Sequence, residues 1–178
     1  EPHGVHAREI TVIGDGVRAI APLEEIDIVT RPAVERVVAA IANQQIVACS
    51  SALGTSRFDG TARSLAHFTR GDAHFDLGNY ERAIADYDEA IQLNPEFAAA
   101  YRNRGESYLR LGQFDRAVVD QARAIYLDPS DATAFYGRGN AYYLSGENDL
   151  AIADYDAAIA IDPSYAFAYN NRGSAYGG

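Results

Sequence analysis

The segment Ala83–Pro95 reads AIADYDEAIQLNP, and the chain contains three versions of it. The second, Ala117–Pro129, reads AVVDQARAIYLDP, and the third, Ala151–Pro163, reads AIADYDAAIAIDP. Each copy begins 34 residues after the one before it. A constant period of this length indicates a solenoid, in which each unit buries its apolar face only by stacking on its neighbours.

Glycines, alanines and prolines keep the same period and divide each unit into two helices. A glycine inside the first helix costs roughly 1 kcal/mol against alanine. We expect an alanine of the second helix to approach it closely. Another glycine closes the first helix in a left-handed turn, and the residue before each proline stops the second helix. These series are Gly71, Gly105, Gly139 and Gly173; Gly78, Gly112 and Gly146; Ala83, Ala117 and Ala151; Ala90, Ala124 and Ala158; and Pro95, Pro129 and Pro163.

In these positions residues 64–178 resemble the tetratricopeptide repeat family, whose unit is a helix-turn-helix of 34 residues. The resemblance implies an all-α, right-handed solenoid in which helix A and helix B alternate. An irregular arm and a helical cap are expected in front of it. The predicted divisions are an arm at 1–31, a cap with a degenerate half-repeat at 32–63, repeats at 64–97, 98–131 and 132–165, and a truncated or capping helix A at 166–178.

The first thirty residues are the least regular part of the sequence. The segment Gly14–Ala19 matches the G-x-G-x-x-A form of the dinucleotide fingerprint, but Pro22 would stop the helix that this motif requires. An irregular or hairpin-like arm is the favoured interpretation. His3 and His6 are spaced like a metal pair, but no further ligand lies near them in sequence.

A helical cap is predicted from Pro32, because proline suits a first turn and an apolar stripe follows it. The stripe breaks at 43–45 and resumes at Ile46–Leu53, which resembles the start of a helix B. Cys49 then takes a helix-B tyrosine position, and we expect it to be a small buried apolar group.

Charged and aromatic residues also follow the period. Arginine stands before each helix-A glycine and aspartate recurs on helix B, which predicts Arg–Asp pairs between helices. His67 and His74 occupy positions that are aromatic in later repeats, which favours a packing role over metal binding. The charged series are Arg70, Arg104, Arg138 and Arg172, and Asp86, Asp120 and Asp154.

Composition excludes several classes of function. A net charge of −10 without a basic stripe argues against nucleic acid as a partner. No apolar run is long enough to span a bilayer. The basic residues other than histidine are all arginine and methionine is absent, which suggests a GC-rich, bacterial genome and an N-terminus that is not the translated one. Cytoplasm and periplasm both remain open, and Cys49 alone does not decide between them.

The resemblance implies a peptide-binding groove on the concave face formed by the A helices. Asparagine amides there could bond an extended backbone, and aromatic rings could give contact area at low entropy cost. An unused scaffold surface is the alternative interpretation. The positions carried over are Phe68, Asp72, Phe75 and Asp76; Arg102, Asn103, Glu106, Leu109 and Arg110; Tyr136, Asn140 and Tyr143; and Asn170 and Asn171.

Chaperone-tail members of the family hold a C-terminal carboxylate with lysines and asparagines. Here only Asn103 stands at such a position, while Phe68 and Asp72 occupy first-repeat clamp positions, so this subclass is disfavoured. Thr133 and Gly137 occupy third-repeat clamp positions.

The favoured function is a non-catalytic adaptor or scaffold that binds protein or peptide segments without a cofactor or metal. A regulatory or targeting module of a larger protein, which could be an enzyme, is the alternative. The sequence shows no nucleophile–base set, metal cluster or phosphate loop. Self-association through the C-terminal repeat end is a further hypothesis.

Overall fold

The computed structural model describes residues 31–54 and 59–177. These residues form eight α-helices and no strand, so the predicted all-α class is confirmed. The predicted arm, with its Gly14–Ala19 motif, His3 and His6, lies outside the described residues except for Arg31. The helices are α1 Arg31–Leu53, α2 Gly60–Asp76, α3 Tyr80–Leu93, α4 Ala98–Arg110, α5 Phe114–Leu127, α6 Ala132–Ser145, α7 Asn148–Ile161 and α8 Ala166–Gly177.

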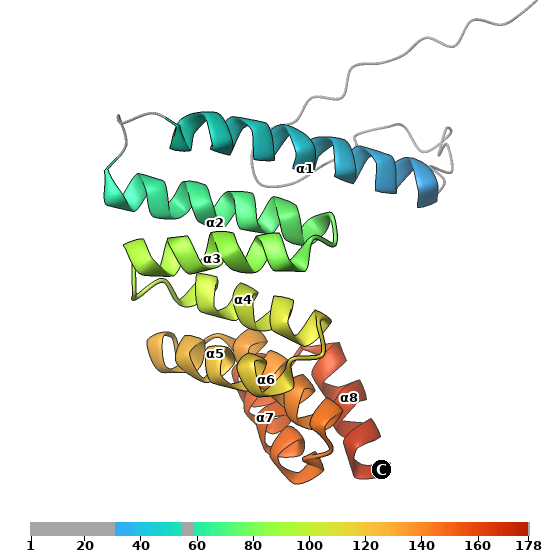
Figure 1. The fold of residues 1–178 in the computed structure, drawn as a ribbon. Helices are drawn as coiled ribbons and strands as arrows, with labels where there is room; N and C mark the ends of the chain where they lie inside the picture. The colour runs from blue at the N-terminus through green and yellow to red at the C-terminus, as the bar shows by residue number, and fades with distance from the viewer. Residues whose placement is uncertain (1–30, 55–58, 178) are drawn as a thin grey trace, which may run out of the picture.

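Six of the helices form three successive hairpins: α2 with α3, α4 with α5, and α6 with α7 (Figure 1). The turns inside them use Gly78, Gly112 and Gly146, with φ of 74°, 72° and 88°. This left-handed conformation strains any residue with a Cβ, which explains the periodic glycine at the end of helix A. Helix α8 follows as the first helix of a fourth unit.

The A helices form the inner face of the array. Helix α2 contacts α4, α4 contacts α6, and α6 contacts α8, whereas α3, α5 and α7 make no contact with one another among the described residues. The array therefore curves with the A helices on its concave side and the B helices on its convex side. In Figure 1 the stack turns along its length, from α1 and α2 at one end to α7 and α8 at the other.

The nearest neighbour of Gly71 and Gly139 inside helix A is a helix-B tyrosine, although the expected alanine is also close to Gly139, with the carbonyl oxygen of Ala151 3.3 Å from a Cβ built there. A Cβ on Gly71 would lie 2.7 Å from Cε1 of Tyr87, and one on Gly139 would lie 2.8 Å from Cε1 of Tyr155. Ala83 is buried in the same core. The tyrosine four residues later lies one turn along the same helix face, and its ring fills the space beside the glycine.

The predicted Arg–Asp pairs between helix A and helix B are present. Each aspartate is buried, and each guanidinium donates to both of its carboxylate oxygens. A buried carboxylate needs such a partner, because its charge would otherwise be desolvated without compensation. The pairs are Arg70–Asp86, Arg104–Asp120 and Arg138–Asp154, with N–O distances down to 2.6, 2.7 and 2.7 Å.

Helix α1 packs on α2 as a helix B packs on the next helix A. Nη1 of Arg70 donates to Oγ of Ser50 at 3.1 Å, just as Nη1 of Arg104 donates to Asp88 in the preceding unit. The helix is continuous through residues 43–45, where the apolar stripe breaks. Cys49 is partly exposed, not fully buried as expected, although burial still raises the pKa of its thiol.

His67 and His74 both face the carboxylate of Asp86. Nδ1 of His67 lies 3.2 Å from Oδ1, and Nε2 of His74 lies 4.0 Å from Oδ2. Burial lowers the pKa of His74. Within residues 31–54 and 59–177, no three His, Cys, Asp or Glu side chains are placed to hold a metal ion, and no helix is long and apolar enough to cross a membrane.

Candidate functional site

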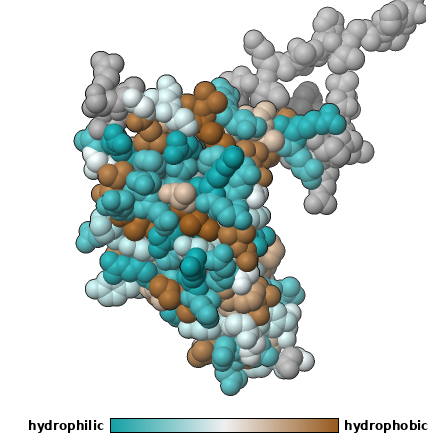
Figure 2. Space-filling model, viewed as in Figure 1, coloured by the Kyte–Doolittle hydropathy of each residue, from teal (hydrophilic) through white to brown (hydrophobic). Residues whose placement is uncertain are grey.

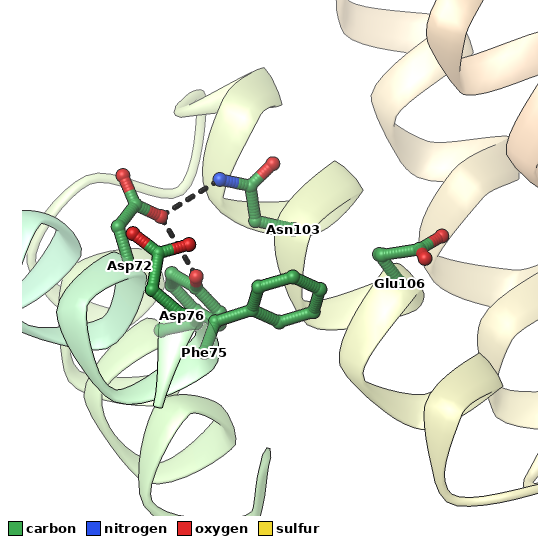
Figure 3. A pocket seen from close by; sticks show the side chains of 6 residues that line it. Asp72, Phe75, Asp76, Asn103 and Glu106 are labelled. Carbon is green, nitrogen blue, oxygen red and sulfur yellow. Dashed lines mark hydrogen bonds between the residues drawn. The ribbon is translucent and has the colours of Figure 1, made fainter. Parts of the chain in front are cut away.

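A cavity of about 280 Å³ opens between α2 and α4 on the concave face. Its walls come from two successive A helices and from the tyrosine that packs behind them. In Figure 3 the ring of Phe75 lies between the carboxylates of Asp72 and Asp76 on one side and Glu106 on the other. The lining residues are Asp72, Phe75, Asp76, Tyr87, Asn103 and Glu106.

Asp72 is fixed by two donors at the back of this cavity. The hydroxyl of Tyr87 donates to Oδ1 at 2.7 Å, and Nδ2 of Asn103 donates to the same atom at 2.8 Å. Burial raises the pKa of Asp72, and these two hydrogen bonds oppose the rise. Burial, followed by the charge of Asp72 and the hydrogen bond to it, holds the pKa of Tyr87 well above its usual value. The cavity therefore has a carboxylate held in a defined orientation.

The other charges of the cavity are more accessible. Asp76 is exposed, and Glu106 accepts a hydrogen bond from Nε of Arg110 at 2.9 Å, one helical turn away. Phe75 packs edge-on against Tyr80, with ring centroids 5.3 Å apart. The cavity thus combines an aromatic wall with three carboxylates, of which one already has an arginine partner.

A second polar cluster joins α6, α7 and α8. Oδ1 of Asn140 accepts from the hydroxyl of Tyr155 and from Nδ2 of Asn171, both at 2.9 Å. Nδ2 of Asn171 also donates to the hydroxyl of Tyr136 at 3.0 Å. Asn140 and Asn171 stand 68 residues after Asp72 and Asn103, so the two clusters occupy equivalent positions in the array.

The junction between α4 and α6 is built differently. Gln121 takes the tyrosine position of helix B, packs against Gly105 and Gly137, and donates from Nε2 to the carbonyl oxygen of Arg102 at 3.1 Å. Its Oε1 is buried with no hydrogen-bond partner among the described residues. Arg102 crosses this junction instead, through an ion pair of 2.7 Å to Asp131.

The structure brings five of the residues predicted for the groove together at the cavity and places others elsewhere. Phe68 packs on Tyr87 and Phe97, with ring centroids 5.8 and 4.6 Å away. Tyr143 packs against the buried core of the third unit, and Asn170 is exposed on α8. The amide groups of Asn103 and Asn171, which were expected to meet a peptide backbone, donate to side chains within the protein.

Tyr87 and Tyr155, which were not predicted as groove residues, reach the concave face from helix B. Each ring crosses over a helix-A glycine, and its hydroxyl bonds the side chain on the groove side. The sequence contained a signal for this position, because each tyrosine shares a helix face with two periodic alanines and stands opposite a periodic glycine.

A repeat profile described as "TPR repeat" matches the chain at residues 71–112, 105–146 and 139–178. The chain belongs to the tetratricopeptide repeat (TPR) family. The matches together cover more than half of the sequence and coincide with the helical units of the structure. No curated protein matches this TPR chain.

Solved TPR structures share its fold. The crystal structure of MamA superposes with a TM-score of 0.71 at 26% identity, covering 83% of each chain. The TPR domain of Arabidopsis OM64 gives a TM-score of 0.65 at 26% identity, over 66% of this chain and 97% of that one. The second TPR domain of human RPAP3, solved with the HSP70 peptide SGPTIEEVD, gives a TM-score of 0.65 at 28% identity, over 66% of this chain and 98% of that one.

Proposed function

We propose that this TPR array is a non-catalytic adaptor that binds peptide segments of partner proteins in its concave groove. The cavity between α2 and α4 supports the proposal, because it joins an aromatic wall to oriented polar groups on the face formed by the A helices. Similar TPR domains of RPAP3 have been solved with peptides from HSP90 and HSP70. Repeat arrays offer extended concave surfaces of this kind for binding.

The charge of the cavity argues for a partner unlike those peptides. SRMEEVD and SGPTIEEVD both end in acidic residues, whereas three carboxylates surround this cavity. Within the described part of the chain, Glu106 is the one of these three carboxylates that forms an ion pair with an arginine, Arg110. A lysine or arginine of the bound segment could lay its aliphatic stem on Phe75 and direct its charge toward Asp76 and Glu106.

A titration of the 178-residue chain tests this proposal. The probes are fluorescein-labelled SRMEEVD and the same peptide with its three acidic residues replaced by lysine. We expect the lysine peptide to bind more tightly and to shift NMR signals of α2 and α4. Asp76→Asn and Glu106→Gln should each weaken it about threefold. Glu96→Gln, an exposed acid outside the cavity, is the control. Equal binding by all variants, or shifts confined to the B helices, would refute the groove.

A further inference from the structure

The convex face of α5 differs in chemistry from those of α3 and α7. At three positions that point outward, α5 has a branched aliphatic residue, an arginine and a tyrosine, whereas the two flanking B helices have small, acidic or amide residues. The α5 residues are Val119, Arg123 and Tyr126; their counterparts are Ala85, Glu89 and Gln92 in α3, and Ala153, Ala157 and Ala160 in α7.

Val119 and Tyr126 are the exposed apolar part of this face. They lie seven residues apart, and therefore on one side of the helix. Val119 is 67% exposed and Tyr126 is 74% exposed. Hydrophilic residues separate the hydrophobic ones into small patches on the side of the molecule shown in Figure 2. Aromatic residues and arginine are enriched at the core of protein–protein interfaces, and Tyr126 together with Arg123 fits that composition.

Two arginines accompany this apolar row. The guanidinium of Arg123 lies 5.0 Å from the ring of Tyr126 and 5.8 Å from that of Tyr101, which holds the arginine along the helix. Arg116 lies 5.5 Å from the ring of Tyr108. Neither arginine forms an ion pair with a carboxylate in the described part of the chain. Their charges remain available to a partner, and the stacked ring of Tyr126 loses little freedom on binding.

The net charge of α5 is zero, whereas each flanking B helix has a net charge of −3. Helix α3 has four acids and one arginine and α7 has three acids and no arginine, but α5 has two acids and two arginines. One of the two acids, Asp120, is buried against Arg104. A cavity of about 330 Å³ borders the row and is lined by Arg104, Tyr108, Asp115, Arg116, Val119 and Asp120.

We propose that Arg116, Val119, Arg123 and Tyr126, the α5 patch, form a second docking surface for an acidic segment of a partner protein. A large apolar side chain of the segment covers Val119 and Tyr126, and flanking carboxylates meet the two arginines. Charge complementarity selects this occupant, because a basic segment would be repelled here although the chain as a whole is acidic. The surface is separate from the concave groove and does not depend on it.

The test exchanges the patch for the residues that α3 carries at the same positions: Val119→Ala, Arg123→Glu and Tyr126→Gln. These exposed residues suit a helix B of this array, so helicity and melting temperature should be retained. The probe is a fluorescein-labelled peptide pool whose varied positions are glutamate, aspartate, leucine or phenylalanine. We expect the triple variant to bind it at least about tenfold more weakly than the wild type. Tyr126→Gln alone should weaken binding severalfold and replaces the triple variant if that variant unfolds.

Two controls locate the site. Asn103→Ala alters the concave groove and should bind the acidic pool as the wild type does. A pool with lysine and arginine in place of the acids should not lose affinity in the triple variant. The proposal is overturned if the wild type fails to bind the acidic pool at millimolar concentration, if the triple variant binds it equally, or if Asn103→Ala abolishes binding. It is also overturned if sedimentation shows a wild-type dimer that the triple variant loses, since a second copy would then cover the patch.

Discussion

The guanidinium of Arg104 donates to both carboxylate oxygens of Asp120, from Nε and Nη2, each at 2.7 Å. Asp120 is buried, whereas the second acid on Arg104, Asp88, has a half-exposed side chain. Asp120→Ala should lower the free energy of unfolding by about 3 kcal/mol, because it leaves a partly buried arginine without its main partner. Asp88→Ala should cost less than about 1 kcal/mol. Urea denaturation of both variants measures the difference, and equal costs would contradict this account.

The glycines inside helix A should respond unequally to alanine. A Cβ on Gly71 would clash with the ring of Tyr87 at 2.7 Å, whereas one on Gly173 would meet no described atom within 4 Å. Gly71→Ala should therefore destabilise the protein by about 1–3 kcal/mol through overpacking. Gly173→Ala should stabilise α8 by up to about 1 kcal/mol, the difference in helix propensity. Thermal melts of the two variants should move in opposite directions.

Asp72→Asn should stabilise the protein at neutral pH. Asn140 shows that an amide fits the equivalent site and accepts the same two kinds of hydrogen bond. Burial raises the pKa of Asp72, so the folded state binds its proton more tightly than the unfolded state. Wild-type stability relative to the variant should therefore rise as the pH falls through the folded pKa, and level off below about pH 4. Urea denaturation at several pH values tests the sign; a variant advantage that grows on acidification would contradict it.

Asp131 has two separable roles at the start of α6. Its side chain accepts from the backbone N–H groups of Thr133 and Ala134 and also pairs with Arg102. Asp131→Ala should cost about 1–2 kcal/mol through loss of the cap and the ion pair. Asp131→Asn keeps an oxygen for the cap and should cost less. The wild-type advantage over the asparagine variant should shrink in 1 M salt, because salt screens the pair.

The period was enough to predict the fold from the sequence. Residues repeated at 34-residue steps fix helix length, turn position and stacking partner together, so the Arg–Asp pairs were also predictable. The residue predicted to pack closest to Gly71, Ala83, was wrong. Spacing shows which residues share a helix face but not how far a side chain reaches. The ring of Tyr87 reaches across the helix pair and supplies the atoms nearest to Gly71.

The candidate site was harder to predict than the fold. Groove positions could be assigned by repeat number, yet the half-buried Phe68 packs on the ring of Phe97, and Asn103 donates a hydrogen bond to Asp72. Such bonds depend on neighbouring units that differ in sequence. Val119 and Tyr126 lie in helix B, the most regular part of the repeat. Their difference from the equivalent residues of the other repeats could be interpreted only after the structure showed that both side chains are exposed.

The unequal polar links between units imply that the array is not uniformly stiff. Asn103 and Asn171 bridge the first and last junctions, and ion pairs on the convex side reinforce both. At the middle junction the corresponding asparagine is Gly137, and the pair of Arg102 with Asp131 is the cross-unit polar side-chain link among the described residues. Under a bending or pulling load, we expect the superhelix to deform first at its middle junction, between α5 and α6. The two halves of the array would then move as nearly rigid bodies about that junction.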